Sequence, residues 1–173
     1  MSLILRKPLR SLIILPVLFT SLLVALVAAT PASAKPSTER IAFSAGFTSQ
    51  NTSLTELPGG HKYGWNDLTA AATINGQQAT VRFQGSVDYT NGSGPFDGFI
   101  TITFADNTQL ALVADGDALL TDSGTTDFTG RINTITGTGK YKGVTGIGTM
   151  RGSRSGELGA PVSLTFRLTL GLK

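Results

Sequence analysis

The sequence has no cysteine and a single histidine, His61, and these absences exclude several kinds of site. Without cysteine there can be no disulfide, no thiolate zinc site and no cysteine nucleophile. One histidine cannot form a histidine metal cluster, and no G-x-S-x-G segment indicates a serine hydrolase. We interpret His61 as an exposed loop residue, expect no cofactor, and expect stability to come from the apolar core and the sheet.

Charged residues are also scarce, at 14% of the chain, and their signs nearly cancel. The sequence has 14 Lys and Arg residues against 11 Asp and Glu residues, a formal net charge of +3. Arg6, Lys7 and Arg10 near the N-terminus account for this excess, so the rest of the chain is formally neutral. Overall charge therefore gives no support to a nucleic-acid partner.

The same three basic residues precede a nearly unbroken apolar run, Leu12–Ala29, and a small-residue A-x-A pattern at Ala32–Ala34. This order is typical of a secretory signal peptide, so we predict that Met1–Ala34 is removed and that Lys35 begins the mature chain. The alternative is an uncleaved membrane anchor, because the run approaches the roughly 18 residues of a spanning helix. The predicted location is secreted, extracellular or periplasmic, with no stable membrane association after cleavage.

Beyond this segment no helical i, i+3, i+4 stripe of useful length is found, and apolar and polar residues alternate with period two between turns. Polar Lys35–Arg40 is predicted to be a disordered leader before a domain at 41–173. Thr48–His61, which contains Pro58-Gly59-Gly60, is predicted to be a loop. The predicted strands are Ile41–Phe47, Tyr63–Ile74, Gln78–Tyr89, Phe99–Phe104, Gln109–Asp115, Thr126–Ile135, a glycine-rich strand within Thr136–Gly152, and Val162–Leu172.

Turn signals separate these strands. Asn75-Gly76 predicts a two-residue hairpin, because both positions of such a turn need positive φ. Gly116 predicts a β-bulge within or beside its strand. The count of about eight antiparallel strands, without a βαβ crossover, predicts an all-β fold: an eight-stranded antiparallel closed β-barrel. A two-sheet sandwich is the alternative.

The stretch Ile135–Gly148, ITGTGKYKGVTGIG, resembles the G-G-[ST]-G-x-[FY]-x-G-x-x-G segment of the allene oxide cyclase and dirigent superfamily. The hairpin Ile100–Leu112 resembles the F-A-D-G-[ST]-x-L hairpin of bacterial members, and Ser163–Gly171 resembles the closing strand. The resemblance implies an eight-stranded barrel with an apolar lumen, often trimeric, that acts on a small apolar ligand. Cyclases of the family close a fatty-acid epoxide, and dirigent proteins steer the coupling of phenoxy radicals.

Several positions depart from the family pattern. Where dirigent proteins often have a functional Asp and an Arg, this chain has Lys140 and Thr145. Plant cyclases carry a glutamate on the first strand, whereas Ile41–Phe47 has no acid and Glu39 precedes it. The barrel and the apolar lumen therefore transfer to this chain, and the plant activities do not.

Polar and aromatic residues within the strands are the candidate ligand-binding residues. If such side chains face the lumen, burial forces them to pair, and a paired Arg–Asp set with a tyrosine could polarise a substrate. Alternation favours the other interpretation, in which the charges lie on the solvent side. The aromatic pair Tyr63 and Trp65 could line a cavity mouth or fill the core. The full set is Tyr63, Trp65, Arg82, Asp88, Tyr89, Asp115, Arg131, Tyr141 and Arg151.

Two other patterns have a structural explanation. The glycines of Thr136–Gly152 match neither the dinucleotide nor the P-loop fingerprint, so they indicate tight turns and close strand packing rather than a phosphate site. Aspartates 115, 117, 122 and 127 lack the D-x-D-x-D-G spacing of a calcium loop, and aspartates in turns usually cap their own backbone.

Two hypotheses about function follow. The first is a secreted barrel that binds a small apolar molecule in its lumen, with isomerase or cyclase chemistry as an option. The second is a non-catalytic structural or interaction barrel with a packed lumen, as is common in small eight-stranded barrels. An open apolar cavity with a buried Arg–Asp or Tyr–Asp pair favours the first, and a solid lumen with every charge outside favours the second.

Overall fold

The structure is a computed structural model that describes residues Pro36–Lys173, and the predicted signal peptide lies outside the described residues. Nearly all of this range is β-strand. No helix in it is long and apolar enough to cross a membrane. The elements are β1 (Ser37–Leu57), β2 (His61–Ile74), β3 (Gln77–Thr90), β4 (Gly94–Phe104), β5 (Gln109–Leu120), β6 (Thr125–Gly137), the 3₁₀ helix η1 (Gly139–Tyr141), β7 (Thr145–Ser155) and β8 (Val162–Leu172).

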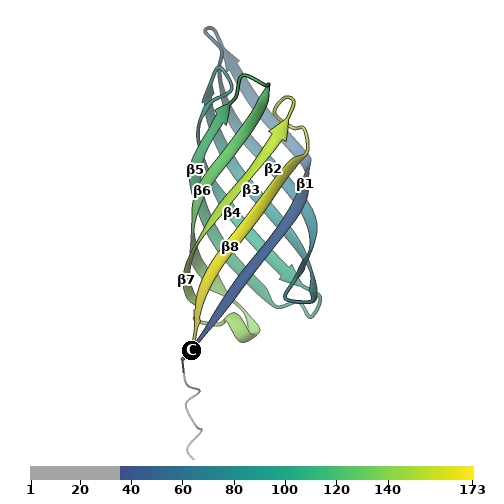
Figure 1. The fold of residues 1–173 in the computed structure, drawn as a ribbon, viewed down its shortest axis with the longest axis vertical. Coiled ribbons are helices and arrows are strands. Elements are labelled where there is room, and N and C mark those ends of the chain that lie inside the picture. Colours follow the sequence, from purple (N-terminus) through teal and green to yellow (C-terminus); the bar gives the residue numbers. More distant parts are fainter. Residues whose placement is uncertain (1–35) are drawn as a thin grey trace, which may run out of the picture. The chain divides into compact units, whose positions relative to one another are not determined.

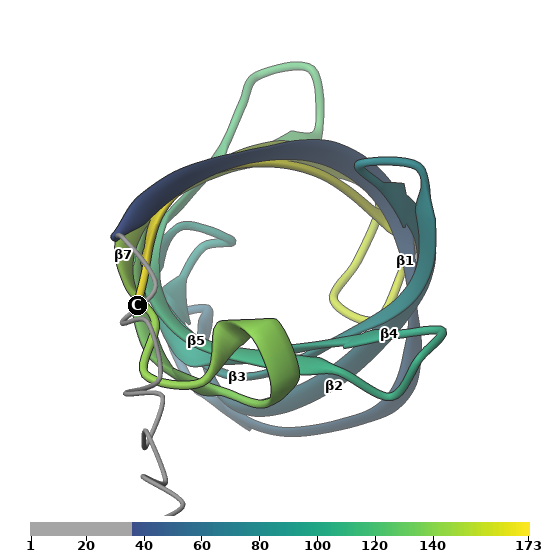
Figure 2. The same cartoon turned by 90° about the horizontal axis from the view of Figure 1, so that it is seen from below.

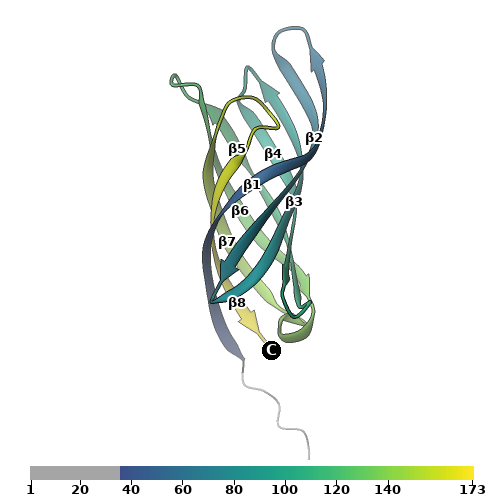
Figure 3. The same cartoon turned by 90° about the vertical axis from the view of Figure 1, so that its right-hand side faces the viewer.

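The strands form one ring in sequence order, and every neighbouring pair is antiparallel (Figures 1 and 3). The ring is closed by β1 and β8, which pair from Ser37 opposite Leu172 to Phe47 opposite Val162. This seam confirms the predicted eight-stranded closed barrel and excludes the sandwich, whose two sheets would each keep unpaired edges.

The two ends of the barrel carry different turns. The β2–β3, β4–β5 and β6–β7 connections meet at one end, together with the start of β1, and η1 lies at its rim (Figure 2). We call this the closed end. The β1–β2, β3–β4, β5–β6 and β7–β8 connections meet at the other, which we call the cavity end.

The core fills the lumen, because the apolar residue of each alternating pair points inward. Along β8 the side chains at every second position from Val162 to Leu170 are buried, and the intervening ones are exposed. Phe43 stacks on Phe166 with ring centroids 4.7 Å apart, joining strands across the closing seam. An eight-stranded barrel is just wide enough for such side chains to fill it.

Strand β1 is longer than the sequence predicts. It begins at Ser37, inside the segment Lys35–Arg40 predicted as a disordered leader, and continues through most of the predicted loop Thr48–His61. Both predictions are wrong for these residues, because the polar side chains have no strand signature of their own. Backbone pairing supplies the strand instead: the first part pairs with the end of β8, and the last part pairs with β2.

The hairpin at Asn75-Gly76 has the predicted geometry, with φ of 48° and 80°. The bulge predicted at Gly116 is wrong, because Gly116 pairs regularly with Phe96 and Gly130. The register instead shifts opposite Ala111 and Leu112, where Ile135 is the extra residue of β6. Gly116 is small for another reason: a Cβ there would lie 2.1 Å from a backbone oxygen of β6 and 2.7 Å from the Phe96 ring.

The glycine-rich strand β7 has the same explanation. Gly146, Gly148 and Gly152 alternate with exposed residues and face the large leucines of β8. A Cβ on Gly148 would lie 2.4 Å from Leu168 Cδ2, and one on Gly152 would lie 1.9 Å from the Ser163 oxygen. Small residues on β7 therefore leave room for large ones on β8, in the close packing expected of protein interiors.

Candidate functional site

Most of the candidate residues named from the sequence lie on the outer face of the barrel, and two lie inside. The outer ones are Tyr63, Trp65, Arg82, Asp88, Asp115, Arg131 and Arg151, all exposed except the half-buried Asp115. Tyr89 and Tyr141 are buried, at 2% and 1% exposure. The structure does not bring the candidates together, because Tyr89 belongs to the cavity end and Tyr141 to the closed end.

The outer charges pair with one another across neighbouring strands. Arg82 donates from Nε to Asp67 Oδ1 at 2.9 Å, and Arg131 Nη2 donates to Asp115 Oδ2 at 2.7 Å. His61 Nε2 lies 2.6 Å from Asp88 Oδ1. The hydrogen bond from Arg82 holds the pKa of Asp67 below its usual range. This placement follows the alternation of the strands, and such exposed pairs contribute little to stability.

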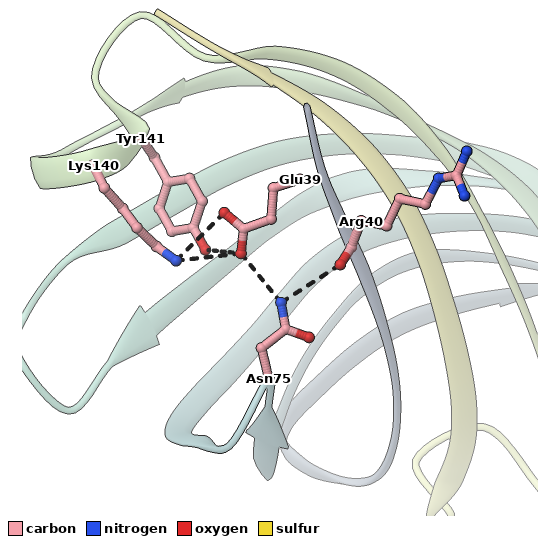
Figure 4. Close-up of polar contacts among 5 residues, drawn as sticks. All are labelled: Glu39, Arg40, Asn75, Lys140 and Tyr141. Atoms are coloured by element: carbon pink, nitrogen blue, oxygen red, sulfur yellow. Dashed lines mark hydrogen bonds and ion pairs between the residues drawn. The ribbon is translucent and has the colours of Figure 1, made fainter. Parts of the chain in front are cut away.

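At the closed end, Glu39 is the centre of a polar network (Figure 4). Its Oε1 accepts hydrogen bonds from Lys140 Nζ at 3.2 Å, Tyr141 Oη at 3.3 Å and Asn75 Nδ2 at 3.1 Å. Asn75 also donates to the Arg40 carbonyl at 3.5 Å. The network ties β1, the β2–β3 turn and η1 together. Glu39 lies within the first strand rather than before it, because it pairs with Leu170 of β8.

Aromatic packing completes this end. The Tyr141 ring stacks on Phe104 with centroids 5.5 Å apart, and Lys140 Nζ lies 4.7 Å from the Tyr141 ring centroid. Burial raises the pKa of the Tyr141 hydroxyl, so the ring stays neutral at ordinary pH. For Lys140, burial alone would lower the pKa, but the hydrogen bonds with Tyr141 and Glu39 outweigh it and the pKa is raised. Glu39 thus accepts hydrogen bonds from both Lys140 and Tyr141, and the Lys140 ammonium also contacts the Tyr141 ring.

The cavity end holds a cavity of ≈ 40 Å³ within the lumen. Since one water needs roughly 10–15 Å³ of space open to its centre, the cavity has room for a few waters. Its walls are mostly apolar and come from most of the strands and from the β7–β8 loop. They comprise Asn66, Leu68, Phe83, Gly85, Ser86, Val87, Tyr89, Phe96, Phe128, Met150, Arg154, Leu158, Val162 and Leu164.

Arg154, near the end of β7, is the buried charge of this cavity, with 5% of its surface exposed. Its Nε donates to the Gly156 carbonyl at 3.2 Å and its Nη2 to Thr126 Oγ1 at 3.3 Å. The guanidinium carbon lies 5.4 Å from the Phe128 ring centroid, a cation–π contact. Burial lowers the pKa of Arg154, while Tyr89 and Glu157 act in the opposite direction.

Two other polar side chains line the cavity, Tyr89 and Asn66. Burial raises the pKa of Tyr89 to about 12, so its hydroxyl is a neutral donor near pH 7. Asn66 is 7% exposed, and its Oδ1 accepts hydrogen bonds from Ser49 and Thr52, each at 2.9 Å. These two bonds fix the orientation of the amide and leave its NH₂ group as the part available to a ligand.

Sequence reasoning did not identify Arg154 or Asn66 as site residues. One signal in the sequence could have identified both residues: each occupies an inward-facing position in the alternation of its strand. Arg154 shares its parity with Met150 in β7, and Asn66 shares its parity with Leu68 in β2, so each belongs to the inward-facing set. The glycines of β7 concealed the signal, because a strand with few large apolar residues has no visible apolar face.

The described residues contain no group of three or more His, Asp or Glu side chains placed to hold a metal ion. Asp115, one of the aspartates weighed as a calcium ligand, pairs with Arg131 instead. The chemistry available in the cavity is that of hydrogen-bond donors and one cation, Arg154, beside an apolar wall.

We compared the chain with known proteins. No family model matches the chain, and no curated protein matches it. Among solved structures, the chain is similar to the pterocarpan synthase dirigent protein GePTS1, with a TM-score of 0.45, 10% identity, and coverage of 82% of this chain and 88% of that chain. It is also similar to the pterocarpan synthase dirigent protein PsPTS1, with a TM-score of 0.44, 9% identity, and coverage of 79% and 94%.

Proposed function

We propose that the barrel binds a small, largely apolar molecule at its cavity end. The observation that carries the proposal is the cavity itself, which has apolar walls and the polar groups of Arg154, Tyr89 and Asn66. Sites for small molecules usually combine an apolar lining with a few placed polar groups.

The size of the cavity limits the ligand. At ≈ 40 Å³ it is far below the roughly 300–1,000 Å³ of a site for a drug-sized molecule. Leu158, which lies between Gly156 and Gly159 in the β7–β8 loop, packs on the core and forms part of the wall. Leu158 is half-buried, so displacement of its side chain would extend the cavity toward solvent. Such a displacement is feasible because Leu158 is held by a loop and not by a strand.

The proposal concerns binding rather than catalysis. No carboxylate and no imidazole is among the residues that line the cavity. Acid–base chemistry on a bound molecule usually needs such a group within hydrogen-bond reach. The closed end has a carboxylate, Glu39, but its hydrogen bonds go to Lys140, Tyr141 and Asn75.

The second candidate function is a structural barrel with a packed lumen. The tight aromatic packing favours it, with Phe96 in edge contact with both Phe83 and Phe128 at centroid distances of 6.3 and 6.0 Å. In that case the ≈ 40 Å³ cavity is a small packing defect occupied by water.

A widened mouth separates the two functions. We expect Leu158→Ala to strengthen binding of 3-phenylpropan-1-ol, measured by calorimetry, because the variant opens space beside the cavity. Leu119→Ala is the control, since Leu119 is 62% exposed and lines no part of the cavity. Mass spectrometry of molecules extracted from the natively purified protein should also find a bound ligand. The structural barrel would be favoured if no ligand is extracted and if 3-phenylpropan-1-ol binds neither to the unaltered protein nor to Leu158→Ala.

We also propose that the protein is exported. The order of basic residues, apolar run and A-x-A pattern at Met1–Ala34 supports this proposal. N-terminal sequencing of the exported protein should begin at Lys35, whereas a chain that retains Met1 would support the membrane anchor.

The trimer implied by the family resemblance remains a prediction, and sedimentation velocity measures the oligomeric state directly.

A further inference from the structure

The charges at the cavity end point to a class of ligand, and this step rests on the function proposed above. Arg154 has been removed from water, and a buried cation is costly unless an anion or enough acceptors replace that water. Within Pro36–Lys173, no carboxylate forms an ion pair with Arg154. Among the residues that the structure describes, this charge therefore has no paired counter-ion.

The neutral partners of Arg154 do not complete its hydrogen bonding. Arginine has five N–H donors, and the described acceptors are the Gly156 carbonyl and Thr126 Oγ1. No described side chain has a fully buried nitrogen or oxygen without a partner. The unpaired part of the guanidinium therefore still reaches space open to water or to a ligand, and Arg154 lines the cavity.

The acid whose charge acts on Arg154, Glu157, does not take the place of a counter-ion. The charge of Glu157 acts on Arg154, but its side chain is 94% exposed and lies 4.0 Å from Lys62 Nζ. Water screens such an exposed carboxylate, so its effect on a buried cation is weak. Glu157 also belongs to the β7–β8 loop, outside the lumen wall.

Two other polar side chains of the cavity, Asn66 and Tyr89, can also donate hydrogen bonds to a ligand. Asn66 Oδ1 is occupied by Ser49 and Thr52, which leaves its two N–H groups, and Tyr89 contributes a hydroxyl. The hydroxyl of Ser86, which also lines the cavity, donates to Asp97. A cation with neighbouring donors and no paired acid is the arrangement that binds an oxyanion.

The position of Phe128 sets the direction of approach. Its ring covers one face of the guanidinium, with the guanidinium carbon 5.4 Å from the ring centroid. A carboxylate then approaches the edge of the group. The described hydrogen bonds use Nε and one N–H of Nη2, so Nη1 and the second N–H of Nη2 are the donors left for its two oxygens. A space of ≈ 40 Å³ suits such a head group but not a hydrocarbon body.

We propose that the cavity end binds a small organic acid. Its carboxylate lies against Arg154 with Tyr89 and Asn66 as additional donors, and its apolar body takes the place of Leu158 at the mouth. The site selects a carboxylate over a neutral group of the same shape, because only the anion neutralises the buried arginine.

A matched pair of probes tests this selection. Calorimetry with 3-phenylpropanoate and 3-phenylpropan-1-ol compares an acid with its neutral counterpart at pH 7. We expect the acid to bind at least about tenfold more tightly, the scale of a charge-assisted hydrogen bond. Arg154→Met should remove the preference, because it weakens binding of the acid much more than binding of the alcohol. Arg151→Met is the control, because Arg151 is an exposed residue of the same strand.

The outcomes separate the two proposals. If both probes bind with equal affinity, or if Arg154→Met retains the preference for the acid, the small-molecule site stands and the organic-acid inference is overturned. If neither probe binds to the unaltered protein or to Leu158→Ala, the small-molecule site fails, and the inference fails with it. Loss of the preference in Arg151→Met as well would assign it to the outer surface and also overturn the inference.

Discussion

The two ends of the barrel share a buried tyrosine beside a basic residue, and they differ in whether a carboxylate is hydrogen-bonded to that pair. Each has a buried tyrosine beside a basic residue: Tyr141 with Lys140 at the closed end, and Tyr89 with Arg154 at the cavity end. Among the described residues, a carboxylate accepts hydrogen bonds from both members of the pair only at the closed end, where Glu39 accepts from Lys140 and Tyr141.

This difference shows how one acid changes the role of a basic group that lies beside a buried tyrosine. Where Glu39 is present, the charges neutralise one another, the polar network ties three segments together, and none of its members lines the cavity of ≈ 40 Å³. Where the acid is absent, the donors are incompletely used and a cavity remains. The polar network at the closed end therefore has a structural role, whereas the cavity end is the proposed ligand-binding site.

The largest effect is expected at the closed end. Tyr141→Ala removes the ring that stacks on Phe104 and the hydroxyl that donates to Glu39. Loss of a buried aromatic ring costs about 3–5 kcal/mol, so the free energy of unfolding in urea should fall by that amount. Tyr63→Ala on the exposed outer face should cost far less. Equal losses in the two variants would contradict the description of this end as a tightly packed joint.

The pH dependence of stability tests the tyrosine of the other end. The folded-state pKa of Tyr89 is raised to about 12 from an unfolded value of 10.0. The neutral form is favoured by folding, so this stabilisation is complete below pH 10 and is lost as the pH rises toward 12. Between these limits the unfolding free energy should fall by roughly 2–3 kcal/mol more in the unaltered protein than in Tyr89→Phe. Parallel curves for the two proteins in alkaline urea titrations would show that Tyr89 is hydrated.

A glycine near the cavity end gives a smaller effect. In Gly152→Ala the new Cβ would lie 1.9 Å from the Ser163 oxygen and 2.8 Å from Leu164 Cδ2. Leu164 lines the cavity and has room to move, but the β8 backbone does not, so we expect a loss of about 1–3 kcal/mol in urea unfolding. Gly46→Ala is the matched control, because nothing lies within 4 Å of a Cβ there. A neutral Gly152→Ala would mean that β7 and β8 are less closely packed.

The smallest effect has the opposite sign. Arg154→Met replaces a buried cation that lacks a paired acid with an apolar side chain of similar length. Such replacements are often neutral or stabilising, and we expect the free energy of unfolding to rise by about 1–2 kcal/mol. Lys140→Met should instead destabilise the closed end, because Glu39 would lose its cation. A loss of several kcal/mol in Arg154→Met would assign Arg154 a structural role like that of Lys140.

The sequence predicted those parts of the fold in which alternation is uninterrupted. The strand Val162–Leu172 has the predicted bounds, and the Asn75-Gly76 turn has the predicted geometry, because local chemistry determines both. The ends of β1 were missed because their conformation depends on pairing with distant strands. The bulge at Ile135 depends on register across β5 and β6, which a single strand does not encode.

The candidate site could be predicted only in part. Tyr89 was identified because it shares a face with Val81, Phe83 and Val87, which are plainly apolar. Arg154 and Asn66 have the correct parity, but a charged or amide side chain on an inward position reads as a surface residue unless its neighbours are known. The missing partner of Arg154 is a property of three-dimensional packing, and no sequence pattern contains it.

The seam between β1 and β8 has a consequence for how the chain reaches this structure. All the other pairs in the ring join strands that are neighbours in sequence. Those hairpins can form from contacts that are local along the chain. The seam joins residues far apart, as in the hydrogen bond between Ser44 and Thr165, which are 121 positions apart. Because closing a long loop costs conformational entropy before any contact forms, closure of the ring is the expected slow step of folding. The same seam is then the place where the ring should first open during unfolding.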